Sequence, residues 1–242
     1  MTRTQLPQLT HAQREARRDE KRAAILGFLA SGEVYTVADI AAQVMGCSRP
    51  TAWRALAALE SDAVLKSEEH MHRGNKIRLW GLTPHGAALA GKFEAPIFEL
   101  GRTNSSWIEH RLDTQRMRLA AEKSGWTQWV PERALQGRGL KKVPDAAALD
   151  THGQWVAIEI ERHCKSHKRM SEIILAYLQE IKANRFARVA YVCPDGIEGL
   201  VQRSFLRVEA VKFQGEMVTL TEAHRSRFSF VGFSNWPEPS HG

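Results

Sequence analysis

The sequence has no long apolar run and few cysteines. No stretch approaches the roughly 20 apolar residues that a membrane-spanning helix needs, and the first 22 residues lack the apolar core of a signal peptide. Cys47, Cys164 and Cys193 are widely spaced and form no CxxC pair, which disfavours a disulfide framework. We therefore expect a cytoplasmic protein with reduced thiols and no membrane partner.

Charged residues are present in ordinary number, but their balance is basic. The chain of 242 residues has 34 lysines and arginines against 27 acidic residues, a formal net charge of +7. A basic balance favours a polyanionic partner such as nucleic acid, although it assigns no function by itself. This length allows one large domain or two small ones, and a change of pattern partway along the chain favours two.

The first ninety residues predict a DNA-binding fold. Residues 12–31 begin charge-rich and end apolar with helical spacing, and residues 37–44 carry one apolar helical stripe. A tight turn at Gly46 and a second helix beginning near Pro50 indicate a helix-turn-helix. Residues 64–83 then alternate into two short strands around a turn, so the unit resembles a winged helix.

In winged helices the second helix of the turn motif enters the major groove, and the tip of the hairpin contacts the backbone or the minor groove. Arginine can bond bidentately to guanine or phosphate, and hydroxyl groups can bond phosphate oxygens. An alternative is a protein–protein dimerisation module, and Trp53 stays unassigned between core and contact surface. The resemblance implies DNA contacts from Ser48, Arg49, Thr51 and Arg54 on the helix and from Arg73, Lys76 and Arg78 on the hairpin.

A linker is expected where the helical period stops. Residues 92–104 contain a proline and a glycine and keep no period, which predicts a connection between a first domain at 1–91 and a second domain at 105–233. Residues 234–242 form a tail. In the second domain we expect helix, three strands, helix and strand, an α/β plan with a central mixed sheet, so that the whole chain is α+β.

One expected strand, residues 154–161, places two acidic residues in an apolar run. Because strand side chains alternate between faces, Glu159 and Glu161 share one face and repel each other. This repulsion destabilises the strand, so the acidic pair favours a functional role over a purely structural one. A turn at residues 150–153 brings the preceding strand alongside and sets Asp145 next to the pair. Three converging carboxylates suit a hard divalent cation, Mg²⁺ or Mn²⁺.

Lys165 follows Glu161 by four residues and completes the predicted site. Its ammonium can orient an attacking water or stabilise developing charge, while a bound metal lowers the pKa of a water, so the set predicts hydrolysis of a phosphodiester. Alternatives remain for each part: the acidic pair can belong to a solvated edge strand, and the lysine to a basic patch. His163 and His167 have helical spacing but lack further zinc ligands nearby.

Pro144-Asp145 followed by Glu159-x-Glu161 resembles the PD-(D/E)XK nuclease superfamily. The chain departs from that motif at the lysine position, which holds Glu161, and the lysine appears later as Lys165. A winged helix, a helix containing "HRL" and a long helix with a central tyrosine resemble, in addition, the replication-relaxation family. The chain length suits MobC-type plasmid mobilisation relaxases.

This resemblance implies a restriction-endonuclease-like second domain and site-specific, metal-dependent nicking of double-stranded DNA at a plasmid transfer origin. An accessory relaxosome or coupling protein is a further expected partner. The helix before the first core strand supplies another acid in such folds, and we assign this role to Glu109, with Asp113 as the alternative. Competing functions are a non-enzymatic DNA-binding regulator or replication-control protein with an inactive nuclease fold, and a restriction-type enzyme that cuts both strands.

The tyrosines distinguish this chain from relaxases that attack DNA with a tyrosine. Those enzymes need a histidine cluster of the HxH kind and an N-terminal tyrosine, whereas the HxH here lies at residues 70–72 in the predicted hairpin. Tyr35, Tyr177 and Tyr191 fall in segments that the pattern predicts to be structural, and Tyr177 in particular is expected to pack in a helix. We therefore expect hydrolysis without a covalent tyrosyl link.

Overall fold

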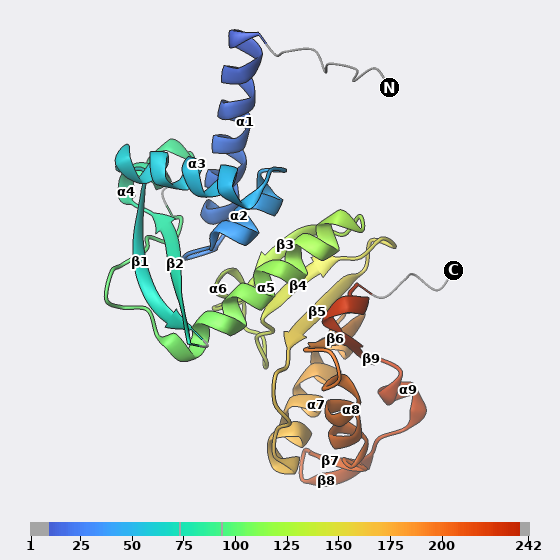
Figure 1. Cartoon of the computed structure of the whole chain (residues 1–242). Coiled ribbons are helices and arrows are strands. Elements are labelled where there is room, and N and C mark those ends of the chain that lie inside the picture. The colour runs from blue at the N-terminus through green and yellow to red at the C-terminus, as the bar shows by residue number, and fades with distance from the viewer. Residues whose placement is uncertain (1–9, 73, 93, 238–242) are drawn as a thin grey trace, which may run out of the picture. The chain divides into compact units, whose positions relative to one another are not determined.

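The computed structural model describes residues 10–72, 74–92 and 94–237. Over these residues the chain is α+β, and it separates into two compact units, Met1–Ser105 and Ser106–Gly242 (Figure 1). Within the same residues, helices are too short or too polar to cross a membrane. Each unit is described by itself below.

The first unit combines four helices with an antiparallel hairpin over its described residues. Apolar side chains of the first three helices are buried, and the hairpin residues Leu79, Trp80 and Leu82 are each at most 1% exposed. The elements in chain order are α1 (His11–Ala30), α2 (Ala38–Val44), α3 (Arg49–Ser61), β1 (Leu65–His72), β2 (Asn75–Leu82) and α4 (Pro84–Leu89).

Local sequence signals explain where these helices begin. Thr10 caps α1 in a capping box, since its hydroxyl accepts the Gln13 N–H at 3.2 Å while the Gln13 side chain accepts the Thr10 N–H at 2.9 Å. Pro50 lies in the first turn of α3, where a missing N–H is tolerated. The Thr83 hydroxyl caps α4 by accepting the Gly86 N–H at 3.0 Å.

The segment expected to be a linker, residues 92–104, packs against the first unit. Phe98 is 1% exposed, and its N–H donates to the Leu82 carbonyl at 3.0 Å. Gly81 makes this approach possible, because a Cβ there would lie 2.3 Å from the Phe98 Cβ. The first compact unit extends to Ser105. The proline and glycine of the segment break its period, but Ala95 and Phe98 are still buried.

The second unit is built on a mixed five-stranded sheet in the order β3-β4-β5-β6-β9. Strands β3, β4 and β5 are antiparallel neighbours, while β5, β6 and β9 run parallel. The elements are α5 (Ser105–Lys123), β3 (Thr127–Pro131), α6 (Glu132–Leu135), β4 (Ala146–Leu149), β5 (Trp155–Ile160), α7 (His167–Lys182), β6 (Arg188–Cys193), α8 (Glu198–Leu206), β7 (Ala210–Phe213), β8 (Glu216–Thr219), α9 (Glu222–Arg225), β9 (Phe228–Gly232) and a 3-10 turn, Phe233–Asn235.

The turn between β4 and β5 has the form that the sequence predicts. The Asp150 carboxylate accepts the N–H groups of His152 and Gln154 at 3.0 and 2.9 Å, and Gly153 takes a positive φ of 71°. This turn sets the register in which Ala146 lies opposite Ile158.

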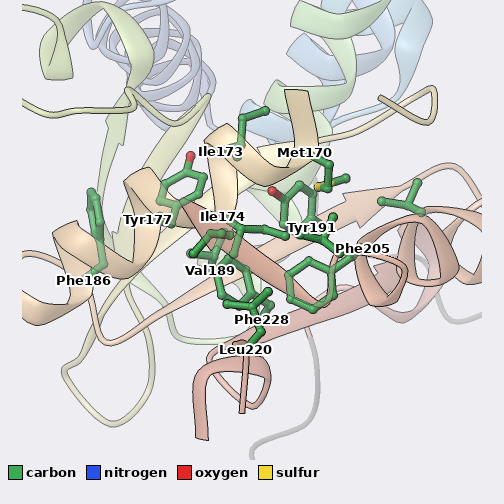
Figure 2. Close-up of a cluster of buried hydrophobic side chains, with 14 of the residues drawn as sticks. Met170, Ile173, Ile174, Tyr177, Phe186, Val189, Tyr191, Phe205, Leu220 and Phe228 are labelled. Atoms are coloured by element: carbon green, nitrogen blue, oxygen red, sulfur yellow. The ribbon is translucent and has the colours of Figure 1, made fainter. Parts of the chain in front are cut away.

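Strand β5 is buried on both faces. On one face Ala157 joins a cluster with Tyr177 and Tyr191, which lies under α7 (Figure 2). On the other face Val156 and Ile158 join a cluster that includes side chains of α5. A carboxylate near the end of such a strand is therefore removed from solvent, unlike one on a solvated edge strand.

The C-terminal part of the sheet differs from the sequence expectation. Strand β9 pairs in parallel with β6 and adds a fifth strand, and the β7–β8 hairpin precedes it. Both lie beyond the last strand that the pattern predicts. These strands have only four or five residues, so few alternations mark them in the sequence.

Candidate functional site

The site begins with Asp145 and Glu159 on adjacent strands. Ala146 pairs with Ile158, so the next position of the register sets Asp145 opposite Glu159 and on the same face of the sheet. The Asp145 Oδ2 atom accepts the N–H of Ile160 at 2.7 Å. The two carboxylates that the sequence predicts as neighbours are thus brought together, and Glu159 is only 5% exposed.

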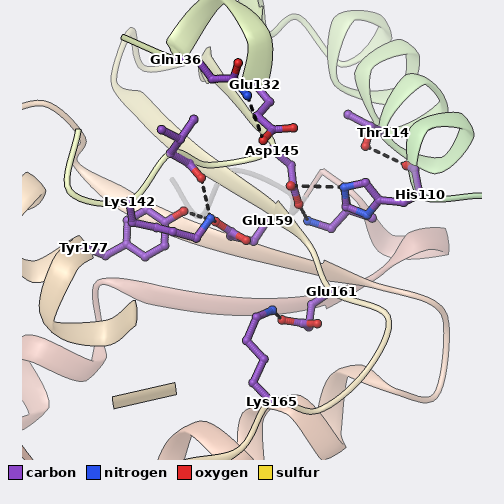
Figure 3. A network of polar contacts seen from close by, with 12 residues as sticks. His110, Thr114, Glu132, Gln136, Lys142, Asp145, Glu159, Glu161, Lys165 and Tyr177 are labelled. Carbon is purple, nitrogen blue, oxygen red and sulfur yellow. Dashed lines mark hydrogen bonds and ion pairs between the residues drawn. The ribbon is translucent and has the colours of Figure 1, made fainter. Parts of the chain in front are cut away.

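His110 of α5 holds the other oxygen of Asp145. Its Nε2 lies 3.2 Å from Asp145 Oδ1, as Figure 3 shows. Burial by itself would lower the pKa of His110, but the hydrogen bond and charge of Asp145, with the charges of Glu159 and Glu132, raise it above its usual value. Burial likewise opposes ionisation of Asp145, but His110 and the Ile160 N–H hold its pKa below the usual value.

Glu159 is held by two other donors. The Lys142 ammonium and the Tyr177 hydroxyl both donate to its Oε1 atom (Figure 3). Burial and the charge of Asp145 nevertheless raise the pKa of Glu159 above its usual value. Burial and the charge of Glu159 raise the pKa of Tyr177 well above its usual value, so this hydroxyl stays protonated and acts as a donor.

The loop that carries Lys142 is anchored to the sequence around α7. The Lys141 N–H donates to the buried Glu180 carboxylate at 2.8 Å. The Arg185 guanidinium donates to the Gly139 carbonyl at 2.9 Å. These contacts direct the Lys142 side chain to Glu159, so its position follows from the fold of the loop.

Glu161 and Lys165 form a separate ion pair. Figure 3 shows this pair apart from the Asp145 and Glu159 carboxylates. Burial lowers the pKa of Lys165 below its usual value, although the charges of Glu159 and Asp145 act in the opposite direction. Lys165 therefore lies within electrostatic range of the two carboxylates, but its direct partner is Glu161.

Glu109 does not reach the carboxylate pair. Its Oε1 lies 2.7 Å from the Arg162 guanidinium, which also contacts Asp113. Asp113 has a second partner in Arg116 at 2.8 Å. The α5 residue beside Asp145 is therefore His110, the immediate neighbour of Glu109, because the rotation of the helix turns position 110 toward β4.

The pair Asp145 and Glu159 fits a hard divalent cation by the chemistry of its donors. Mg²⁺ keeps several waters and commonly binds through one or two carboxylates. Burial and the charge of Asp145 raise the pKa of Glu159, and a cation beside this carboxylate would favour its ionised form. Among the described residues, no three His, Cys, Asp or Glu side chains gather as a larger metal centre. The structure brings Asp145 and Glu159 together, whereas Glu109 contacts Arg162 and Glu161 contacts Lys165.

In the first unit, the predicted DNA contacts of α3 lie on its N-terminal part. The hydroxyls of Ser48 and Thr51 are 3.0 Å apart. Arg54 donates to the carbonyl of Pro50 at 3.3 Å, and Arg49 pairs with Asp39 at 2.7 Å. All of these contacts are at exposed side chains, so the two arginines can exchange them for an external partner.

On the hairpin, Arg78 is less exposed than Lys76. Arg78 pairs with Glu69 at 2.6 Å and lies over the ring of Trp53, while Lys76 is 3.9 Å from Glu69. Trp53 is 39% exposed and meets Trp80 edge to face at 4.7 Å, so it is partly core and partly surface. Arg73 lies outside the described residues.

Three residues of the site were not predicted for their roles: His110, Lys142 and Tyr177. Sequence signals for two of them exist, since Lys142 ends a basic loop just before Pro144-Asp145 and His110 adjoins the acid chosen from the helix. Tyr177 does pack in α7, as expected, but it also donates to Glu159.

Comparisons with known proteins add little to this geometry. No protein-family model and no curated protein matches the chain. Part of the chain is similar to the structure of an apo-form mutant of Lactococcus lactis ZitR, with 23% sequence identity and a TM-score of 0.26. The match covers 33% of this chain and 58% of that one. A TM-score this low carries no argument about fold or function.

Proposed function

We propose that the protein is a metal-dependent endonuclease that hydrolyses a phosphodiester of double-stranded DNA and nicks one strand at a plasmid transfer origin. One observation carries the proposal. Asp145, directly before the buried strand β4, lies opposite Glu159 of the buried strand β5, with His110 on one carboxylate and Lys142 on the other. Buried acids with shifted pKa values beside basic groups are typical of catalytic sites.

The order of elements in the second unit supports a PD-(D/E)XK-like assignment. Helix α5, strands β3, β4 and β5, helix α7 and strand β6 follow in the order that the sequence predicts for such a domain. Asp145 directly precedes β4 and Glu159 lies one residue before the end of β5. The two acids of the motif thus lie at the start of β4 and near the end of β5, where these neighbouring strands bring them together.

Each side chain of the site has a role in this proposal. Asp145 and Glu159 are the ligands for Mg²⁺ or Mn²⁺, which when bound lowers the pKa of a water and stabilises the charge of the phosphodiester. The Ile160 N–H and His110 orient Asp145. Lys142 places a positive charge beside Glu159, where it can offset the charge of a bound phosphate.

The first unit supports DNA as the substrate. Helices α2 and α3, the turn at Gly46 and the β1–β2 hairpin follow in the order of a winged helix. Arg49 and Arg54 are exposed near the start of α3, the part of such a helix that reads base edges. In this proposal the first unit selects the site and the second unit cleaves it.

A nicking assay tests the proposal. Supercoiled DNA that contains the sequence flanking the protein's own gene is incubated with the protein and Mg²⁺ or Mn²⁺, and open circles are expected. Asp145→Asn should leave the DNA supercoiled. Cleavage that continues in the Asp145→Asn protein, or in excess chelator, would contradict the assigned site.

A second candidate is a DNA-binding regulator whose nuclease-like unit is inactive. One observation favours it: Asp145, Glu159 and Glu161 each contact a basic side chain of the chain itself. A site whose charge is already balanced in this way can be stable without a metal. Specific DNA binding by a wild-type protein that never nicks, with Mn²⁺ present, would decide for this candidate.

A further inference from the structure

Helix α1 has two parts with different surroundings. Ile25, Leu26 and residues 28–30 are buried in the first unit. Residues 11–20 are exposed at every position, and this part of α1 extends beyond the other elements of the unit in Figure 1. The exposed part therefore contributes little to the core.

Basic residues gather on one side of α1 between residues 14 and 22, where Arg14, Arg17 and Arg18 are exposed and Lys21 and Arg22 are half-buried. With 100° of rotation per residue, five basic side chains fall within an arc of about 140°. Glu15, Asp19 and Glu20 fall outside this arc. We call the arc the basic face of α1; it consists of Arg14, Arg17, Arg18, Lys21 and Arg22.

Most of the basic face is not neutralised. Arg22 lies 3.4 Å from Asp62, at the end of α3. Across the described part of the chain, the ion pairs found involve none of the other four basic residues of the face. Arg14 and Arg18, and likewise Arg17 and Lys21, are four residues apart, a spacing at which like charges repel and destabilise a helix.

The helix also lacks the acidic residues that would stabilise its first turn. An isolated solvated helix is stabilised by alternating charges at this spacing, so the segregation of charge indicates an external polyanion. The two ends of the basic face, Arg14 and Arg22, are eight residues or about 12 Å apart along the axis. Duplex DNA presents one phosphate for about every 1.7 Å of its axis, which matches several basic side chains at once.

Other partners fit the exposed part of α1 less well. Its uncharged side chains are mainly alanines, with one glutamine and one histidine. A membrane-surface helix needs large apolar residues such as Trp, Phe or Leu opposite its basic side. The centre of a protein–protein interface is depleted of charged residues and enriched in aromatic ones. Neither condition is met here.

We infer that the basic face of α1 binds the phosphate backbone of duplex DNA, as a contact separate from that of α3. This inference rests on the proposed function for the identity of the partner, but not for cleavage. Contacts of this kind carry no sequence information, and they add affinity that decreases with salt. They would hold the first unit on DNA while α3 reads the bases.

The test compares two variants of the full-length protein on the same helix. One replaces Arg14, Arg17, Arg18 and Lys21 by glutamine; the control replaces Glu15 and Glu20 by glutamine and Asp19 by asparagine. Glutamine is a good helix former, and circular dichroism checks that helicity is kept. Dissociation constants for a short duplex are measured by fluorescence anisotropy between about 50 and 200 mM salt.

The basic-face variant should bind more weakly, and the slope of log affinity against log salt should become less steep by up to about 3.6, or about 0.9 for each lost phosphate contact. The acidic variant should keep the wild-type slope. An unchanged slope in the basic-face variant overturns the inference. A change of slope in the acidic variant that is equal in size and opposite in sign also overturns it, because net charge alone would then explain both results. If nicking that depends on Asp145 is observed, the proposed function stands whatever the salt dependence of the variants. If the slope is reduced but the wild-type protein does not nick DNA, the proposed function is refuted and the inference about α1 is kept.

Discussion

Lys142 and Glu159 meet in the second unit although they are 17 positions apart in the chain. The lysine comes from the loop before β4, and the glutamate from near the end of β5. This contact places a positive charge at the carboxylate that also faces Asp145. The lysine that contacts this carboxylate thus precedes Asp145 in the chain, whereas the sequence pattern points to Lys165, which follows Glu161.

The first prediction is that nicking depends on the carboxylates of Asp145 and Glu159. Asp145→Asn and Glu159→Gln should abolish nicking, because each removes a charged metal ligand while keeping the shape of the side chain. DNA binding should stay near the wild-type level, since α3 lies in the other unit. Glu216→Gln, at an exposed position of β8, is the matched control and should cleave normally in the same assay.

The two lysines should differ in their effects. We expect Lys142→Met to reduce the rate of nicking about 100-fold or more, the usual effect of removing one stabilising donor. Lys165→Met should reduce the rate of nicking less. Of the two lysines, Lys142 contacts Glu159, whereas Lys165 contacts Glu161. Single-turnover nicking rates at saturating DNA are measured for both variants. A larger loss of rate in Lys165→Met than in Lys142→Met would assign the stabilising role to Lys165.

Recognition by α3 can be separated from cleavage. Arg49→Ala or Arg54→Ala should weaken binding to the specific site by ~1–3 kcal/mol if that arginine reads a guanine. Arg78→Ala is a useful comparison, because Arg78 already pairs with Glu69. Gel-shift titrations at fixed salt give the affinities. Equal affinity for wild type and both α3 variants would favour the dimerisation alternative for this unit.

The cut DNA should carry no protein. Tyr177 is buried, donates its hydroxyl to Glu159 and has a pKa well above its usual value, so it is a poor nucleophile. Tyr35 and Tyr191 are also buried. Water attack predicts that denatured nicked product migrates as free DNA. A protease-sensitive adduct on one end would contradict hydrolysis, even if Asp145 proved essential.

Removing the Tyr177 hydroxyl should lower the stability of the folded protein but leave its nicking activity in place. In Tyr177→Phe the buried Glu159 loses one of its two donors, which is expected to reduce the free energy of unfolding by about 1–3 kcal/mol. Nicking should persist under conditions where the variant is folded. Urea denaturation of both proteins measures the difference, and a stability equal to wild type would contradict the buried contact.

Cysteine labelling checks the sheet. Burial, with the nearby charge of Glu198, raises the pKa of Cys193 to about 12, whereas Cys164 is exposed. A thiol reagent at mildly alkaline pH should therefore label Cys164 quickly and Cys193 only after unfolding. In a Cys47→Ser background, Cys164→Ser should remove the fast phase. Fast labelling of Cys193 in the native protein would mean that the end of β6 is accessible.

Local pattern was sufficient for several parts of this protein. The alternation along residues 154–161 and the turn signal at Asp150 and Gly153 predicted the strand pair, and that pairing is what sets Asp145 opposite Glu159. The beginnings of α1 and α3 were also readable from sequence. These features depend on residues close together in the chain, whose periodicity and turn chemistry are local properties.

Tertiary structure alone decided which basic group meets which acid. His110, not Glu109, reaches Asp145 because of the rotation of α5 against the sheet, and Lys142 reaches Glu159 because contacts with Glu180 and Arg185 fix its loop. The position of β9 likewise depends on the path of the chain after β6. A one-residue rotation of a helix, or another path of a loop, changes side-chain partners without changing the sequence period, so local pattern cannot determine these contacts.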